Sequence, residues 1–184
     1  MMMMAMMVAA VTANAQQMFV KPMVGATVAK ITDADDAAWK IGIAAGGEFG
    51  YLLNEQFAVT AGALVSMQGT KDSEDDDYSM TTTYLNVPIL ANYYIIPGLA
   101  VKAGFQPGLL LSQKTKFHGG EYTDTDHFTK LDMSIPIGVS YEFSDFVIDA
   151  RYNLGLNSIY DSDYSDYKPK NSVIMLTLGY KIPF

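Results

Sequence analysis

The last twelve residues of the chain, VIMLTLGYKIPF (173–184), alternate between two kinds of side chain. One face carries only apolar residues: Ile174, Leu176, Leu178, Tyr180, Ile182 and Phe184. The other face is small and mixed and includes a charge: Val173, Met175, Thr177, Gly179, Lys181 and Pro183. Because successive side chains of a strand point to opposite faces of the sheet, this period of two predicts a β-strand with one wholly apolar face.

The same alternation recurs along the rest of the chain. It predicts seven further strands, at about 20–30, 39–51, 57–68, 85–93, 99–109, 131–143 and 146–156. Most are longer than the five or six residues usual in soluble sheets and match the nine to eleven residues of a membrane-crossing strand. The sequence therefore predicts an all-β fold of eight antiparallel strands.

The connections between these strands alternate between short and long. Residues 54–56, 97–98 and 144–145 carry turn-forming residues, whereas residues 32–38, 70–81, 116–129 and 158–170 are long and polar. Short periplasmic turns and long extracellular loops are the layout of an outer-membrane barrel. We therefore expect residues 16–184 to form an eight-stranded antiparallel transmembrane up-and-down β-barrel, located in the cell outer membrane with both ends in the periplasm.

Composition excludes several other classes of protein. No run of eighteen apolar residues is present, which argues against a helical membrane protein. The net charge of −8 argues against nucleic-acid binding, which needs a basic face. The chain has no cysteine, so it has neither disulfides nor thiolate metal sites, and nothing in it points to a cofactor.

Residues 1–15 have the features of a signal peptide. An apolar stretch precedes Ala13 and Ala15, whose small-x-small spacing is accepted by signal peptidase, so we expect cleavage after Ala15. The stretch carries no Lys or Arg before Lys21, unlike an ordinary signal peptide. A Met-rich disordered tail is the alternative.

The charged residues decide which face of each strand meets lipid. If the apolar faces point outward, eight charged residues point inward: Lys40, Glu48, Lys102, Asp132, Glu142, Asp149, Arg151 and Lys181. The opposite choice places all eight in lipid, where each Lys or Arg costs about 2–4 kcal/mol at the midplane. We therefore predict a polar cluster of four bases and four acids in the lumen that pair across it, with a structural role.

Many glycines share the inward face with these charges: Gly42, Gly46, Gly50, Gly62, Gly104, Gly108, Gly138, Gly155 and Gly179. They make room for the long polar side chains, and an interior of eight strands is just filled by side chains, so we expect no open pore. An aromatic girdle is predicted at the periplasmic strand ends, formed by Tyr51, Phe57, Tyr93, Phe143, Phe146 and Phe184. The alternative, a soluble sandwich or lipocalin-like barrel, needs polar residues on the outside.

Four segments carry a family resemblance: YLNVPIL (84–90), AGFQPG (103–108), DARYNLGL (149–156) and LGYKIPF (178–184). With them, the chain resembles the Gram-negative outer-membrane β-barrel domain proteins, also called PorT-like or porin-family proteins, which include OmpX-like and OmpA-like eight-stranded barrels. The resemblance implies that the terminal aromatic is read by barrel-assembly machinery. It implies little about activity.

Two groups of residues are candidates for chemistry. His118 and His127, with Ser112 or Ser134 near the same rim, allow a lipid A acylase or deacylase, although nothing in the sequence fixes such a catalytic geometry. Solvent-exposed loop histidines are the favoured interpretation. The acidic runs at 72–77 and 161–166 can attract divalent ions, but they lack the glycine and the distal glutamate of an EF-hand loop, so no metal site is predicted.

The sequence favours a non-enzymatic outer-membrane protein with a structural, adhesive or binding role, or an accessory subunit of an envelope complex. A lipid-modifying enzyme and a narrow passive pore remain the alternatives. The expected partners are outer-membrane lipid, lipopolysaccharide, the barrel-assembly machinery and a protein bound through the extracellular loops.

Overall fold

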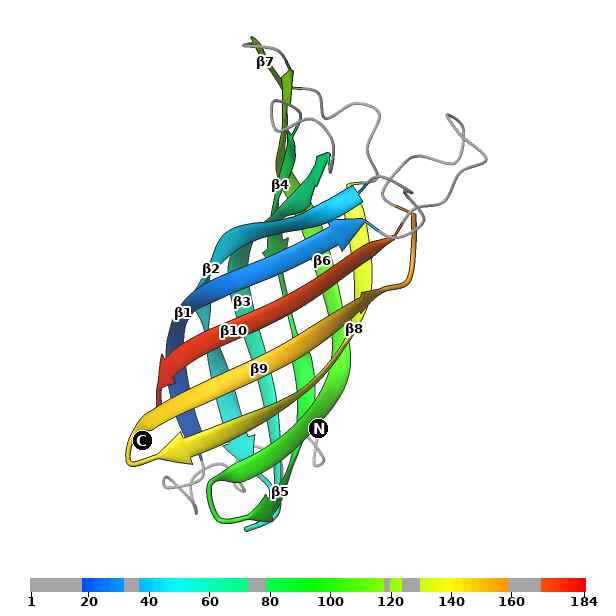
Figure 1. Ribbon diagram of the computed structural model, residues 1–184. Coiled ribbons are helices and arrows are strands. Elements are labelled where there is room, and N and C mark those ends of the chain that lie inside the picture. The colour runs from blue at the N-terminus through cyan, green and yellow to red at the C-terminus, as the bar shows by residue number, and fades with distance from the viewer. Residues whose placement is uncertain (1–17, 32–36, 73–78, 118–119, 124–129, 159–169) are drawn as a thin grey trace, which may run out of the picture.

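The computed structural model describes residues 18–31, 37–72, 79–117, 120–123, 130–158 and 170–184, which form an all-β closed barrel (Figure 1). Its strands are β1 (Met18–Ile31), β2 (Ala37–Leu52), β3 (Phe57–Asp72), β4 (Ser79–Asn86), β5 (Ile89–Ile96), β6 (Leu99–Phe117), β7 (Gly120–Thr123), β8 (Leu131–Phe143), β9 (Phe146–Gly155), β10 (Asn171–Tyr180) and β11 (Ile182–Pro183). Within these residues, no helix is long and apolar enough to cross a membrane.

Eight walls make up the barrel, as the sequence predicts. All pairings are antiparallel, and β1 closes the sheet against β10, from Met23 opposite Gly179 to Ile31 opposite Asn171. The last wall consists of β10 and β11, because β11 continues the pairing with β1. The short strand β7 is not one of the eight walls; it pairs antiparallel with the end of β6. The prediction of an eight-stranded antiparallel barrel is confirmed.

The fourth wall is a strand in two pieces, β4 and β5, where the sequence predicts one continuous strand. Both pieces keep one register against β3, since Leu64 lies opposite Asn86 and Ala61 opposite Ile89. Pro88 lies in the break and Pro107 on β6 bonds to Val87 there, and a proline has no N–H to contribute to the ladder. The Val87 N–H still donates to Pro107 O at 2.8 Å, so the wall stays closed.

Two predicted loops are shorter than expected because the strands run further. β3 continues to Asp72 and β4 begins at Ser79, within the predicted loop 70–81. β7 lies within the predicted loop 116–129 and pairs with the end of β6. The neighbouring antiparallel strand supplies hydrogen bonds to these polar segments, which extends the strands beyond their apolar part.

The three tight turns lie at one end of the barrel, together with the end of the chain (Figure 1). Asn54 Oδ1 accepts hydrogen bonds from the backbone N–H of Gln56 at 2.8 Å and of Phe57 at 2.9 Å, which closes the first turn. Gly98 has a φ of 86°, a left-handed conformation that glycine adopts without strain. At the same end, the Phe184 N–H bonds to Met18 O at 3.0 Å.

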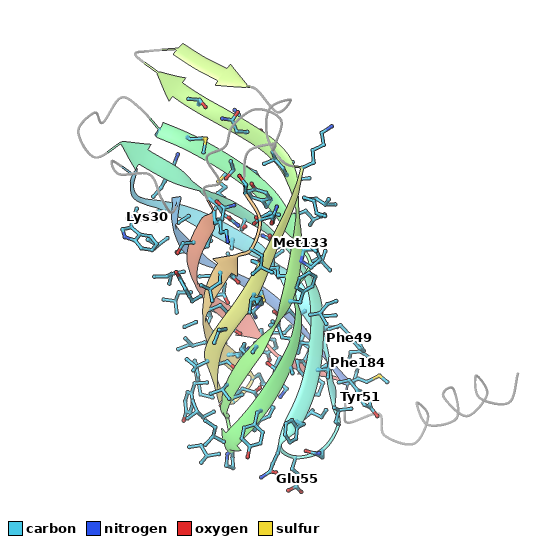
Figure 2. All side chains as sticks on the ribbon, turned by 90° about the vertical axis from the view of Figure 1, so that its right-hand side faces the viewer. Lys30, Phe49, Tyr51, Glu55, Met133 and Phe184 are labelled. Atoms are coloured by element: carbon cyan, nitrogen blue, oxygen red, sulfur yellow. The ribbon has the colours of Figure 1, made fainter. Side chains whose placement is uncertain are left out.

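The exterior is apolar, as the chosen orientation of the strands predicts (Figure 2). Outward side chains such as Ile41, Ile43 and Ile137 are half or more exposed. Aromatic rings gather at the short-turn end: Phe57 packs on Tyr93, and Phe146 packs on both Phe143 and Tyr180. The predicted girdle is present there and is larger than predicted.

Candidate functional site in the barrel interior

Five charged side chains meet inside the barrel near its short-turn end. They are Lys21 on β1, Glu48 on β2, Lys102 on β6, and Asp149 and Arg151 on β9. Each side chain is at most 4% exposed. We call these five residues the lumen cluster.

Asp149 and Glu48 are the acidic centres of the lumen cluster. The Asp149 carboxylate accepts hydrogen bonds from Arg151 Nε at 2.6 Å and Nη2 at 2.9 Å, and it also pairs with Lys102. Lys21 Nζ lies 2.9 Å from Glu48 Oε2 and 3.6 Å from Asp149 Oδ2. Arg151 Nη2 also reaches Glu48, although neither contact to Glu48 has the angles of a hydrogen bond.

Glycines on neighbouring strands leave the space that these long side chains occupy. A Cβ on Gly62 would lie 2.6 Å from Glu48 Cγ, and one on Gly179 would lie 2.9 Å from Lys21 Cγ. A Cβ on Gly138 would lie 3.1 Å from Arg151 Cγ. The predicted role of the inward glycines is therefore confirmed at three walls of the barrel.

Sequence reasoning identified four of the five residues and missed Lys21. The alternation along β1 is weak, because the outward face includes Pro22 and Ala26 beside Val20, Val24 and Val28. Continuing that outward face through Val20 places Lys21 inside, opposite Glu48 in the register. The apolar even-numbered residues Val20, Val24 and Val28 are the sequence signal that Lys21 points inward.

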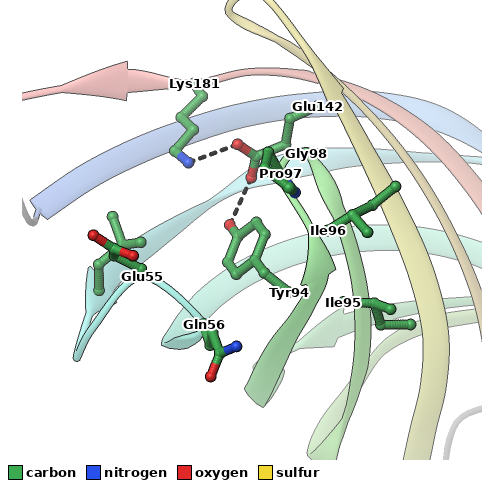
Figure 3. Close-up of a pocket in the computed structure, with 10 residues that line it drawn as sticks. Glu55, Gln56, Tyr94, Ile95, Ile96, Pro97, Gly98, Glu142 and Lys181 are labelled. Atoms are coloured by element: carbon green, nitrogen blue, oxygen red, sulfur yellow. Dashed lines mark hydrogen bonds and ion pairs between the residues drawn. The ribbon is translucent and has the colours of Figure 1, made fainter.

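Glu142 and Lys181 form a separate group at the short-turn mouth (Figure 3). Glu142 accepts hydrogen bonds from Tyr94 Oη at 2.6 Å and Lys181 Nζ at 2.7 Å. Lys181 Nζ also lies over the Phe19 ring, 4.6 Å from its centroid. This group lines a pocket of about 470 Å³ together with Glu55, Gln56 and the 95–98 turn.

The remaining two predicted residues lie towards the long-loop end. Lys40 donates to Met80 O at 3.1 Å and contacts Thr81. Asp132 is buried, and its carboxylate accepts from Asn171 Nδ2 at 3.4 Å. The eight predicted residues therefore do not form a single group of four bases and four acids: they divide among the lumen cluster, the mouth and the long-loop end.

Side chains fill the interior between these groups. Met23, Ala44, Leu64 and Met175 form an apolar cluster inside the barrel. Beyond it, Ser66 Oγ accepts hydrogen bonds from Gln68 Nε2 at 2.9 Å and Asn86 Nδ2 at 2.7 Å. An apolar group and a set of buried amides therefore obstruct the described part of the lumen in addition to the lumen cluster.

Those candidates for chemistry that lie among the described residues do not form a site. Ser134 is buried in the lumen, where it bonds to Gln106, and Ser112 is half-buried on β6. His118, His127, residues 73–77 and residues 161–166 lie outside the described residues, as does the predicted signal peptide. In the described part of the chain, no three His, Asp or Glu side chains are arranged to hold a metal ion.

Comparison with known sequences identifies the family. Residues 9–161 match the family described as outer membrane protein beta-barrel domain. The chain belongs to this family. For an outer-membrane barrel domain, the apolar exterior and its aromatic girdle are the surfaces that meet lipid. No curated protein sequence matches the chain.

Solved structures of bacterial outer-membrane barrels share this fold. The chain is similar to Neisserial surface protein A (NspA), with a TM-score of 0.58 and 14% identity over 91% of this chain and 97% of that one. It is also similar to Ail, the attachment invasion locus protein of Yersinia pestis, in complex with the heparin analogue sucrose octasulfate. That comparison gives a TM-score of 0.55 and 18% identity over 90% of this chain and 99% of that one. At these identities the likeness concerns the fold alone.

Proposed function

We propose that this outer-membrane barrel domain protein is a non-enzymatic, non-conducting anchor that presents acidic loops at the cell surface to cationic partners. The observation that carries the proposal is the filled interior. Five charged residues, each at most 4% exposed, occupy the lumen together with an apolar cluster. A barrel filled in this way offers no aqueous path, which leaves the loops as the parts available for contact.

The distribution of charge supports this role for the loops. Twelve of the twenty Asp and Glu residues lie in the segments 32–36, 73–78, 118–119, 124–129 and 159–169. The described strand ends that flank these segments lie at the end opposite the tight turns, and the β4–β6–β7 region projects beyond the other strands there (Figure 1). The acidic segments would attract divalent cations bridging to lipopolysaccharide phosphates, and basic protein surfaces.

Neither comparison structure supplies a ligand for this chain. Ail is solved with a sulfated heparin analogue, which is a polyanion. The acidic loops of the present chain favour a ligand of the opposite charge. Of the two candidate nucleophiles of the lipid-enzyme alternative, Ser134 is unsuitable because its hydroxyl faces the lumen and not the lipid.

Binding to intact cells tests the loop proposal. Cells expressing the protein should bind a fluorescent oligolysine peptide more strongly than control cells, and should not gain binding of labelled heparin. A variant with Glu74, Asp75, Asp76 and Asp77 replaced by the corresponding amides should lose much of the gain. The unboiled gel mobility of the variant should stay that of a folded barrel. Equal oligolysine binding by the two proteins would contradict the proposal.

Conductance in planar bilayers tests the closed interior. The refolded protein should give a silent trace at moderate voltage. A variant with Lys21, Glu48, Lys102, Asp149 and Arg151 all replaced by alanine, and shown to be folded by gel mobility, should also stay silent, because the apolar cluster and the buried amides still obstruct the lumen. Steady conductance by the unmodified protein would refute the anchor proposal in favour of a passive pore.

A further inference from the structure

The lumen cluster holds more positive than negative charge. Lys21, Lys102 and Arg151 are the cations, while Glu48 and Asp149 are the only carboxylates among the five. The nearest mouth pair, Glu142 with Lys181, adds one charge of each sign. The interior at this level therefore carries an excess of one positive charge, although the whole chain has a net charge of −8.

Hydrogen-bond donors beside this excess charge lack partners among the described residues. Arg151 Nη1 has no hydrogen-bond partner, although the Arg151 side chain is 1% exposed. Thr177 Oγ1 is also without a partner and lies on β10 opposite Asp149. The amide of Asn153, two residues beyond Arg151 on the same face of β9, is likewise unpartnered. A buried guanidinium nitrogen without an acceptor is costly, and more so where the surrounding charge is already positive.

We propose that the lumen cluster binds a small monovalent inorganic anion of the halide class at Arg151 Nη1. Such an ion would both accept the free guanidinium N–H and neutralise the excess charge. A water molecule would supply only the acceptor, so charge balance distinguishes the two occupants. The lumen cluster lies near the tight-turn end, and the apolar group of Met23, Leu64 and Met175 lies inside the same barrel. The ion would therefore be a buried structural counterion.

Halide dependence of unfolding tests this proposal. The refolded full chain would be heated in detergent while sodium chloride or bromide replaces sodium gluconate at constant ionic strength. We expect the unfolding midpoint to rise and then saturate. At ten times the dissociation constant the rise should be about 3–6 °C, corresponding to a roughly tenfold smaller unfolded fraction.

Two variants and a matched control make the test specific. Lys21→Met makes the lumen cluster neutral while both carboxylates keep Arg151 within reach, so it should lose the halide-dependent rise. Asp149→Asn increases the excess charge and should show a larger rise. Lys130→Met removes the same charge from an exposed position and should behave as the unmodified protein. An unchanged rise in Lys21→Met, or no rise in the unmodified protein, would overturn the proposal.

Bromide diffraction provides a readout that does not depend on the variants folding. In crystals of the unmodified protein grown with sodium bromide, an anomalous peak should lie within hydrogen-bond distance of Arg151 Nη1. A map with no bromide peak in the lumen would overturn the proposal, whatever the variants do.

Discussion

Lys21 and Lys102 stand on opposite walls of the barrel, and their ammonium groups approach the same oxygen, Oδ2 of Asp149. Going round the barrel in either direction, β1 and β6 are four walls apart, counting β4 and β5 as one wall. The Asp149 carboxylate therefore links two walls that share no backbone hydrogen bond. Because of this cross-lumen link, we expect substitution of Asp149 to destabilise the barrel more than substitution of another residue of the lumen cluster.

Asp149→Asn should lower the free energy of unfolding by about 3–5 kcal/mol, because it leaves buried cations without their carboxylate. Urea unfolding in phospholipid vesicles measures the change. Adding Lys102→Met to Asp149→Asn should recover part of the loss, since it removes one of the stranded charges. Asp145→Asn, at an exposed turn, is the control and should change little. Equal effects of Asp149→Asn and Asp145→Asn would show that the lumen cluster does not stabilise the barrel.

Two neighbouring glycine positions offer a test of interior space. Gly62→Ala should cost about 1–3 kcal/mol, because the new Cβ would lie 2.6 Å from both Glu48 Cγ and the Gly47 carbonyl oxygen. Gly47→Ala should be tolerated, because its nearest new contact would be 3.5 Å away. The same vesicle unfolding experiment applies. A similar cost at both positions would mean that the crowding at Gly62 is relieved by movement of Glu48 and the adjacent backbone.

A charge on the exterior should be costly only within the lipid. Ile137→Lys, at the middle of β8, should cost about 2–4 kcal/mol in a bilayer, whereas the effect should fall to about 0–1 kcal/mol near the interface. Leu53→Lys, in the tight turn between β2 and β3, provides the interface position. The urea midpoints of unfolding of the Ile137→Lys and Leu53→Lys variants measure the difference in stability. If both lysines are tolerated equally, the apolar exterior does not lie in lipid.

The mouth group should contribute less than the lumen cluster. Tyr94→Phe removes the hydrogen bond to Glu142 and should cost about 0.5–1.5 kcal/mol, because Lys181 remains as a partner in a partly hydrated position. Tyr93→Phe is a matched control, since the Tyr93 side chain faces outward and is 40% exposed. Identical unfolding curves for the two variants would contradict a stabilising role for the Tyr94 hydroxyl.

Most of the fold was predictable from the sequence because a barrel has two chemically different faces. The strand period, the tight turns at 97–98 and 144–145, and the inward direction of charges such as Arg151 all follow from keeping polar groups out of lipid. The break at Pro88 was not predicted, because the alternation of side chains passes through a proline unchanged while the hydrogen bonding does not.

The grouping of the interior charges was less predictable than their direction. The strand pattern shows that Glu142 and Asp149 point inward, but the tilt and register of the walls decide at which level each one lies. Lys21 was missed because the small and proline residues around it weaken the alternation that marks an inward position. The pairing register of the strands determines the level of each charge along the barrel, and the period of two does not give that register.

The order in which the chain is made gives the lumen cluster a further consequence. Lys21 belongs to the first wall, while Asp149 and Arg151 belong to the seventh, so these partners stay apart until nearly the whole chain is available. Non-local contacts of this kind form late, after the entropy of closing a long loop has been overcome. In an unclosed sheet within lipid, these charges would lie without their partners. We therefore expect membrane insertion and pairing of the first wall with the last to occur as one concerted event.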